Sequence, residues 1–225
     1  MSTTSPARLI LHGNAMWTSP YVLSCFVGLT EKKLPFEVQT VALHEGAHRS
    51  ATFTARSFTA RVPALVDGDF SLSESSAIIE YLEDKWPAPG HAPLLPQDLR
   101  QRARARQIMA WVRSDLMPIR EERSAEYVFY PPDALPPYAP LSAMACKALE
   151  KLVSFAERVV PGDAGALFGA WCVADTDLAM MLQRLVKTNE PLPARLRAFA
   201  EREWQRPSVQ AFANVRRPPH RGALT

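Results

Sequence analysis

The sequence predicts a small α/β domain followed by an all-helical domain. In the first third of the chain, short β-branched and apolar runs alternate with helical patterns, which is typical of strands interleaved with helices. Beyond about residue 100 the strand pattern ends, and apolar residues recur at three- and four-residue spacing, which indicates amphipathic helices. The predicted fold class is therefore α/β plus all-α.

The first domain is expected to hold three strands and two helices. Ser19 and Pro20 mark a helix start, because serine is a favoured N-cap and proline suits the first turn. The expected strands cover residues 8–12, 36–43 and 64–66, and the expected helices cover residues 20–32 and 75–86.

Prolines mark the boundary between the two domains. Of the 20 prolines, four fall between residues 87 and 96, where neither a helix nor a central strand can run. We therefore expect domains over residues 1–87 and 99–225, joined by a linker over 88–98.

Charge and hydropathy exclude several functional classes. The chain has 225 residues, with 26 Lys and Arg against 23 Asp and Glu. Residues 216–225 carry three arginines and no acid, so the other 215 residues sum to zero (23 minus 23). A protein body with no net charge lacks the broad basic surface that nucleic-acid binding requires. No apolar run approaches the roughly 18 residues of a spanning helix, and the N-terminus lacks a secretory pattern, so we expect a cytoplasmic protein without membrane association.

Cysteine and histidine patterns do not predict a metal site. Three widely spaced cysteines argue against a disulfide framework or a zinc ribbon. Residues 44–48 match the H-E-x-x-H zinc pattern, but they follow an extended run and contain Gly46, which weakens a helix. We expect a polar loop here and no metal.

Three short segments are candidates for a binding site. They are Thr18–Tyr21 before the first helix, Arg61–Leu65 entering a strand, and Leu72–Ile78 leading into a helix. Each is a common loop by itself. A helix N-terminus such as that at Ser19 also favours an anion, because its unpaired N–H groups and its dipole point outward.

The order of these three segments is similar to that in the cytosolic glutathione S-transferase superfamily. Together with the predicted domain plan, the resemblance covers nearly the whole chain. The resemblance implies a thioredoxin-like N-terminal domain joined to an all-helical C-terminal domain. Residues 102–123 and 168–181 are similar to the bacterial YfcF-type branch, a glutathione transferase with thiol-dependent peroxidase activity.

The resemblance implies a glutathione site in which Ser19 is the catalytic residue and donates a hydrogen bond to the thiolate. The backbone of Val62, before a cis proline, is expected to pair with the cysteinyl part of glutathione. The asparagine, tryptophan and threonine at positions 14, 17 and 18 lie close enough that one of them, rather than Ser19, could face the sulfur. The glutathione-binding residues implied are Ser19, His48, Val62, Pro63, Glu74 and Ser75.

A second-substrate pocket is expected over the sulfur for an electrophile or a hydroperoxide. Its residues are Trp17, Trp111, Asp115 and Met117, and Pro118 is expected to kink the helix that carries the last three. Trp111 fits a buried core position equally well.

The resemblance implies an enzyme that activates the glutathione thiolate for attack on electrophiles, with glutathione-dependent peroxidase activity as a further expectation. Two alternatives are a non-catalytic glutathione-binding scaffold module and a maleyl-type glutathione-dependent isomerase. A homodimer is expected as well. One departure from the family pattern is Cys172, which stands where a hydroxyl residue usually caps the central helix of the second domain.

Overall fold

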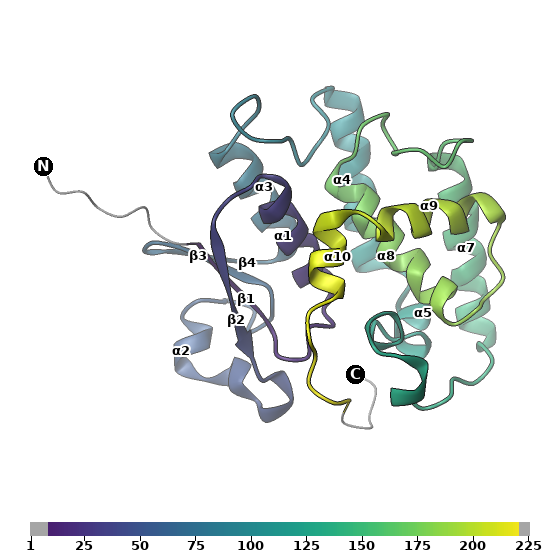
Figure 1. Ribbon diagram of the computed structural model, residues 1–225, viewed down its shortest axis with the longest axis horizontal. Coiled ribbons are helices and arrows are strands. Elements are labelled where there is room, and N and C mark those ends of the chain that lie inside the picture. The colour runs from purple at the N-terminus through teal and green to yellow at the C-terminus, as the bar shows by residue number, and fades with distance from the viewer. Residues whose placement is uncertain (1–8, 221–225) are drawn as a thin grey trace, which may run out of the picture. The chain divides into compact units, whose positions relative to one another are not determined.

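The computed structural model describes residues 9–220, and its internal contacts divide the chain into one unit up to Leu94 and a second from Leu95. The first unit contains a single sheet with helices, and the second contains helices (Figure 1). This is the expected combination of a thioredoxin-like domain and a helical domain.

The sheet of the first unit has four strands in the order β2-β1-β3-β4. The central strand β1 (Leu9–Asn14) runs parallel to β2 (Phe36–Val41) and antiparallel to β3 (Ala64–Asp67). Strand β4 (Phe70–Ser73), which the sequence analysis did not predict, pairs with β3 through a two-residue turn. Gly68 supplies the positive φ of 64° that this turn requires.

Helices cover both faces of the sheet. Helix α1 (Pro20–Glu31) packs against Gly13, where a Cβ atom would lie only 2.9 Å from a methyl group of Val22. On the other face, the ring of Phe53 in α2 (Ala51–Thr54) meets His12 edge to face at 5.8 Å. Neighbouring residues of a strand point to opposite faces, so α1 and α2 lie on opposite sides. Helix α3 (Ser75–Lys85) packs beside α1.

A buried ion pair ties the proline-rich segment to the first unit. The Nζ atom of Lys32 lies 2.8 Å from Oε2 of Glu83, and both side chains are buried. The same ammonium group donates to the carbonyl oxygens of Trp86 and Ala92, at 2.7 and 3.0 Å. Glu83 also accepts the N–H of Leu94 at 2.9 Å. The buried charges are thus compensated by hydrogen bonds.

The second unit is built around one buried helix, α8, which packs against α4, α6 and α9 (Figure 1). Short 3₁₀ turns complete the two units. The helices are α4 (Leu99–Ser114), α5 (Met117–Glu122), α6 (Glu126–Phe129), α7 (Ala143–Val159), α8 (Val173–Lys187), α9 (Ala194–Trp204) and α10 (Pro207–Ala213), and the turns are η1 (Leu43–Glu45), η2 (Ala47–Arg49) and η3 (Pro132–Ala134).

The expectation that Pro118 kinks a continuous helix is wrong. Helix α4 ends at Ser114, and Leu116 adopts a left-handed conformation with φ of 64° before α5 begins at Met117. Pro118 lies in the first turn of α5, where a backbone N–H has no acceptor within the helix, so proline, which lacks this N–H, fits without loss of a hydrogen bond. The backbone therefore breaks two residues before the proline.

Asp175 does most of the capping at the start of α8. Its Oδ2 accepts the N–H of Cys172 at 2.9 Å, and its Oδ1 accepts the N–H of Leu167 at 2.7 Å. Burial raises the pKa of Asp175, and burial also raises the pKa of the Cys172 thiol. A single buried carboxyl group thus satisfies two backbone donors beside a cysteine that hydrogen-bonds weakly.

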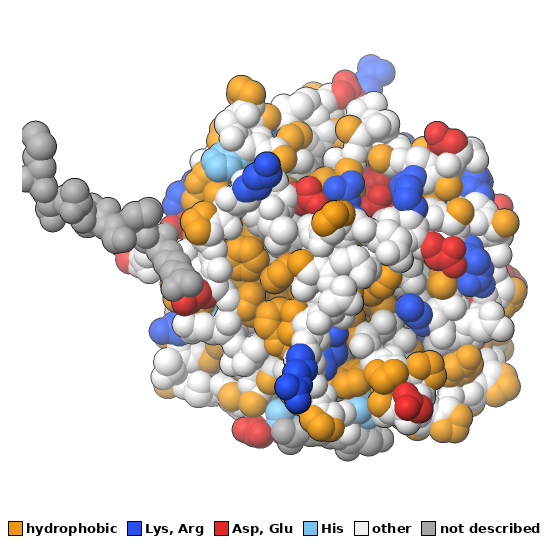
Figure 2. All heavy atoms as spheres, in the orientation of Figure 1, with side chains coloured by type: hydrophobic (Ala, Val, Ile, Leu, Met, Phe, Trp, Pro, Cys, Tyr) orange, Lys and Arg blue, Asp and Glu red, His pale blue; other side chains and the backbone are white. Residues whose placement is uncertain are grey.

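Charges of both signs are interspersed on the face of the molecule drawn in Figure 2.

None of the helices within residues 9–220 combines the length and the apolar character needed to cross a membrane.

The substitution Asp175→Ala is expected to lower the free energy of unfolding by about 3 kcal/mol, because two buried N–H groups lose their acceptor. Urea denaturation measures this. Asp98→Ala, which removes the exposed N-cap of α4, serves as the control and is expected to cost about 1 kcal/mol. Equal losses in the two variants would contradict the special role of Asp175.

Candidate functional site

Four chain segments meet at one edge of the sheet in the first unit. Strands β1 and β2 end at this edge, because Asn14 is paired in register with Val41. His12 pairs with Ala64, and Ala64 pairs with Ser73, so β3 begins and β4 ends at the same edge. The loops that carry the predicted glutathione-binding residues therefore start or finish side by side.

Ser19 caps α1 at this edge. Its half-buried side chain accepts the N–H of Val22 through Oγ at 3.3 Å, and Pro20 occupies the first helical turn. The first turn contains no acidic residue, so no internal carboxylate competes for the positive end of the helix dipole. This arrangement favours an anion at the N-terminus of α1.

The loop between β1 and α1 is closed by the side chain of Asn14. Its Oδ1 accepts the N–H of Ser19 at 3.1 Å, and its Nδ2 donates to Oγ1 of Thr18 at 2.9 Å. The carbonyl oxygen of Asn14 accepts the N–H of Trp17 at 3.0 Å. Asn14 and Thr18 are both buried, and the ring of Trp17 contacts Phe26 edge to face at 6.3 Å.

Val62 and Pro63 lead directly into β3. The peptide bond between them is cis, as the resemblance implies, and both residues are buried. The loop before them is fixed by Ser57, whose hydroxyl donates to the carbonyl oxygen of Arg61 at 2.8 Å and accepts the N–H of the same residue at 3.2 Å.

Glu74 has an unusual backbone conformation, with φ of 75° and ψ of 116°, and its side chain is exposed. Non-glycine residues in such conformations concentrate at functional sites, because the strain must be held in place by the surrounding structure. Helix α3 begins at the next residue, the buried Ser75. The thiol of Cys25 in α1 donates to the carbonyl oxygen of Ser75 over 3.8 Å, so Cys25 links the two helices.

His48 lies in the turn η2 and is half-buried, and its buried Nδ1 atom has no hydrogen-bond partner among residues 9–220. Gly46, with φ of 76°, separates η2 from η1, so His44 and His48 do not share a helix face as the H-E-x-x-H pattern would require. His44 instead contacts the neighbouring Glu45 at 2.9 Å. Over the described part of the chain, no group of three His, Cys, Asp or Glu side chains is placed to hold a metal ion.

Two of the residues predicted for a second-substrate pocket lie together in the second unit. Nε1 of Trp111 donates to Oδ2 of Asp115 at 3.0 Å, and the Trp111 ring is tilted against that of Phe155 in α7 at 4.3 Å. Lys151 forms an ion pair with Asp115, and its hydrogen bond, followed by that from the N–H of Leu116, lowers the pKa of this carboxyl group.

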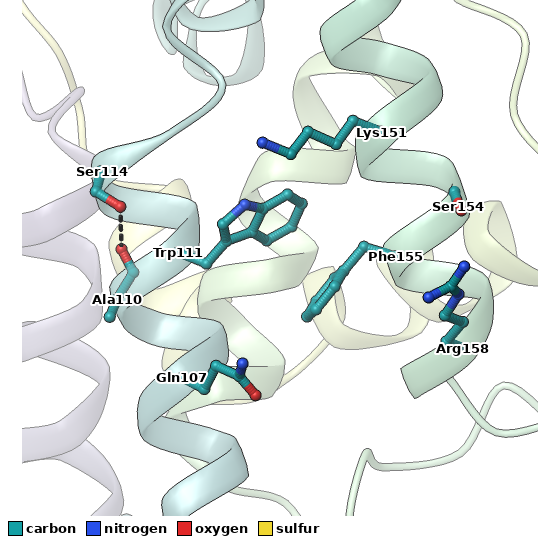
Figure 3. Close-up of a pocket in the computed structure, with 8 residues that line it drawn as sticks. All are labelled: Gln107, Ala110, Trp111, Ser114, Lys151, Ser154, Phe155 and Arg158. Atoms are coloured by element: carbon teal, nitrogen blue, oxygen red, sulfur yellow. Dashed lines mark hydrogen bonds between the residues drawn. The ribbon is translucent and has the colours of Figure 1, made fainter.

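Trp111, Phe155 and Lys151 line an open groove of about 580 Å³ between α4 and α7 (Figure 3), whereas Asp115 is not among its lining residues. Met117 lies outside the set of lining residues and is exposed at the start of α5. The α7 side of the groove was not predicted, although Phe155 and Lys151 have the four-residue spacing of one helix face. The lining residues are Gln107, Ala110, Trp111, Ser114, Lys151, Ser154, Phe155 and Arg158.

Comparison with known proteins identifies the family. Residues 18–85 match the model of the glutathione S-transferase N-terminal domain, and residues 98–217 match that of the C-terminal domain. Glutathione S-transferase theta-1 from Mus musculus is 40% identical over 91 residues, which span 40% of this chain and 37% of that protein. The chain thus matches less than half of the length of this relative.

Two other proteins align over nearly their whole length. Glutathione S-transferase Z2 from Arabidopsis thaliana is 31% identical over 218 residues, covering 90% of this chain and 96% of that protein. A crystal structure of a glutathione transferase homolog from Burkholderia GL BGR1, with bound glutathione, is 42% identical with a TM-score of 0.75. The alignment with that structure covers 91% of this chain and 96% of the Burkholderia chain. The chain belongs to the glutathione S-transferase family.

Proposed function

We propose that this protein binds glutathione at the edge of the sheet described above and that Ser19 donates a hydrogen bond to the glutathione thiolate. One observation carries the proposal. The Oγ atom of Ser19 accepts the N–H of Val22 at the N-terminus of α1, which leaves the hydroxyl proton for an anion beside the helix end.

The energies of these interactions are sufficient to ionise a thiol near neutral pH. A free thiol has a pKa near 8.5, and lowering it by about two units requires about 2.7 kcal/mol. A hydrogen bond to a charged group contributes roughly 1.5 to 3 kcal/mol, and a helix N-terminus adds roughly 0.3 to 1 kcal/mol. No separate general base is needed.

The other groups of the site match the remaining parts of glutathione. The carboxylate of Glu74 is exposed at the strained turn, where it pairs with the γ-glutamyl amine. Ser75 at the start of α3 binds the γ-glutamyl carboxylate, and the backbone of Val62 pairs with the cysteinyl residue. His48, whose buried Nδ1 lacks a partner among the described residues, binds the glycyl carboxylate.

The bound thiolate reacts in one of two ways. It attacks an electrophilic carbon, forming a C–S bond while the leaving group departs with the electron pair. Alternatively, it attacks a hydroperoxide oxygen and breaks the O–O bond, which gives glutathione sulfenic acid and an alkoxide that takes a proton from water to become the alcohol. A second glutathione then converts the sulfenic acid to the disulfide and water. The similarity of residues 102–123 and 168–181 to the YfcF-type branch favours testing the peroxide reaction.

Ser19→Gly is expected to lower turnover near pH 7 about 10- to 100-fold, because the thiolate loses one charge-assisted hydrogen bond. Glycine is a tolerated N-cap, so the fold is retained. Turnover is measured with 1-chloro-2,4-dinitrobenzene and with cumene hydroperoxide, and glutathione binding by calorimetry.

Ser142→Gly, the same change at the N-cap of α7, is the matched control and keeps full turnover. Unchanged turnover in the Ser19 variant would disprove the role of Ser19. Glutathione binding by the wild-type protein without turnover on either substrate would instead identify a non-catalytic glutathione-binding module.

Glu74→Gly is expected to raise the free energy of unfolding by about 1 kcal/mol, because glycine has no Cβ atom to clash with the backbone at a positive φ. The same variant binds glutathione about tenfold more weakly, because the γ-glutamyl amine loses its charged partner. Glu74→Ala keeps the strain and is expected to show the weaker binding alone. Urea denaturation and calorimetry separate the two effects, and unchanged affinity in both variants would remove Glu74 from the site.

We propose also that the protein is a homodimer in which a second copy covers the groove between α4 and α7. Its aromatic floor, formed by Trp111 and Phe155, is open to solvent in the single chain (Figure 3). In the first unit, the side chain of Phe58 is 96% exposed and supplies an apolar group that such a groove can bury. Removing these aromatic rings from water favours association.

Phe155→Glu is therefore expected to shift the protein from dimer to monomer in size-exclusion chromatography with light scattering. Ala198→Glu, which adds one carboxylate to an exposed position on α9, is the control and stays dimeric. A dimer in both variants would place the interface elsewhere.

A further inference from the structure

We infer that Asn14 is a positioning residue that sets the direction in which the Ser19 hydroxyl donates, an inference that rests on the function proposed above. Asn14 ends β1 and is only 8% exposed. Its side chain spans the loop to the N-terminus of α1 and contacts Thr18 and Ser19.

The orientation of the Asn14 amide follows from the chemistry of its two partners. The backbone N–H of Ser19 can only donate, so the atom that faces it at 3.1 Å must be the amide oxygen. The amide nitrogen then faces Oγ1 of Thr18 at 2.9 Å, and the Thr18 oxygen must accept. The geometry thus excludes the flipped amide.

This orientation determines what Ser19 can offer to a ligand. The Ser19 N–H is consumed by Asn14, so it does not bind an anion itself. The Ser19 oxygen accepts the N–H of Val22. These two hydrogen bonds, one from the Ser19 backbone N–H and one to its Oγ atom, hold the residue at the helix end, and its hydroxyl proton is the group left to donate to a sulfur.

Asn14 can hold this position because its own backbone is fixed. It pairs with Val41 of β2 in the parallel register, and its carbonyl oxygen accepts the N–H of Trp17 at 3.0 Å. The three polar atoms Oδ1, Nδ2 and O of Asn14 thus bind three successive loop residues, Ser19, Thr18 and Trp17. A buried, fully bonded side chain of this kind holds a neighbouring group more firmly than a solvent-exposed loop would.

The test compares Asn14→Ala and Asn14→Asp by ultraviolet titration of the thiolate of bound glutathione. In Asn14→Ala the thiol pKa is expected to rise by about one unit, the shift that corresponds to losing a well-placed charge-assisted hydrogen bond. Turnover falls about threefold near pH 7, in line with the smaller thiolate fraction, and recovers at high pH, while KM for glutathione changes less than about threefold. Asn14→Asp keeps an acceptor for the Ser19 N–H, and the Thr18 hydroxyl can turn to donate to the new carboxylate. The thiol pKa in Asn14→Asp is therefore expected to stay close to the wild-type value.

Thr18→Val provides a second variant should Asn14→Ala fail to fold. It removes the partner that orients the amide, and it is expected to raise the thiol pKa in the same direction. Unchanged thiol pKa in both Asn14→Ala and Thr18→Val, with a raised thiol pKa in Ser19→Gly, would overturn the role of Asn14 and leave the proposed function intact. An unchanged thiol pKa in Ser19→Gly as well would overturn both.

Discussion

The hydrogen bonds between the end of β1 and the start of α1 are the constraint on which the rest of the site depends. Asn14 binds the backbone of Ser19, and Ser19 caps α1, so the strand and the helix dipole are joined at one point. Gly13 lets the helix approach the strand closely enough for this, since a Cβ atom there would lie 2.9 Å from Val22. Local chain chemistry thus places at the edge of the sheet a helix end that favours an anion.

Strand pairing in the sheet places the other residues of the candidate site at the same edge. The antiparallel register of β3 with β1 and β4 brings the start of β3 beside the end of β4, and with them Val62 and Glu74. Glu74 retains a strained backbone there, whereas the buried charged groups of Lys32 and Asp175 are each compensated by hydrogen bonds. Backbone strain is thus held in place at the candidate site, and the buried charges of Lys32 and Asp175 are stabilised by their hydrogen bonds.

Much of this could be predicted from the sequence because it depends on local chemistry. The cap at Ser19 and the first-turn Pro20 follow from the preferences of single residues. Strand β4 was missed because its last residues, Leu72 and Ser73, were assigned to the segment that leads into the next helix, although its Gly-Asp turn is a hairpin signal. The break before α5 comes from the left-handed Leu116, which no residue preference indicates. The groove at Trp111 depends on α7, and pairing between helices distant in sequence is set by tertiary packing.

The measurement that tests the central claim most directly is proton release when glutathione binds near pH 7. Titration calorimetry in two buffers of different ionisation enthalpy counts the protons released per site. If the N-terminus of α1 lowers the thiol pKa by about two units, roughly 0.7 proton is released per glutathione at pH 7, and S-methylglutathione, which has no thiol proton, releases none by this route. Binding of glutathione with no more proton release than its S-methyl analogue would contradict the account.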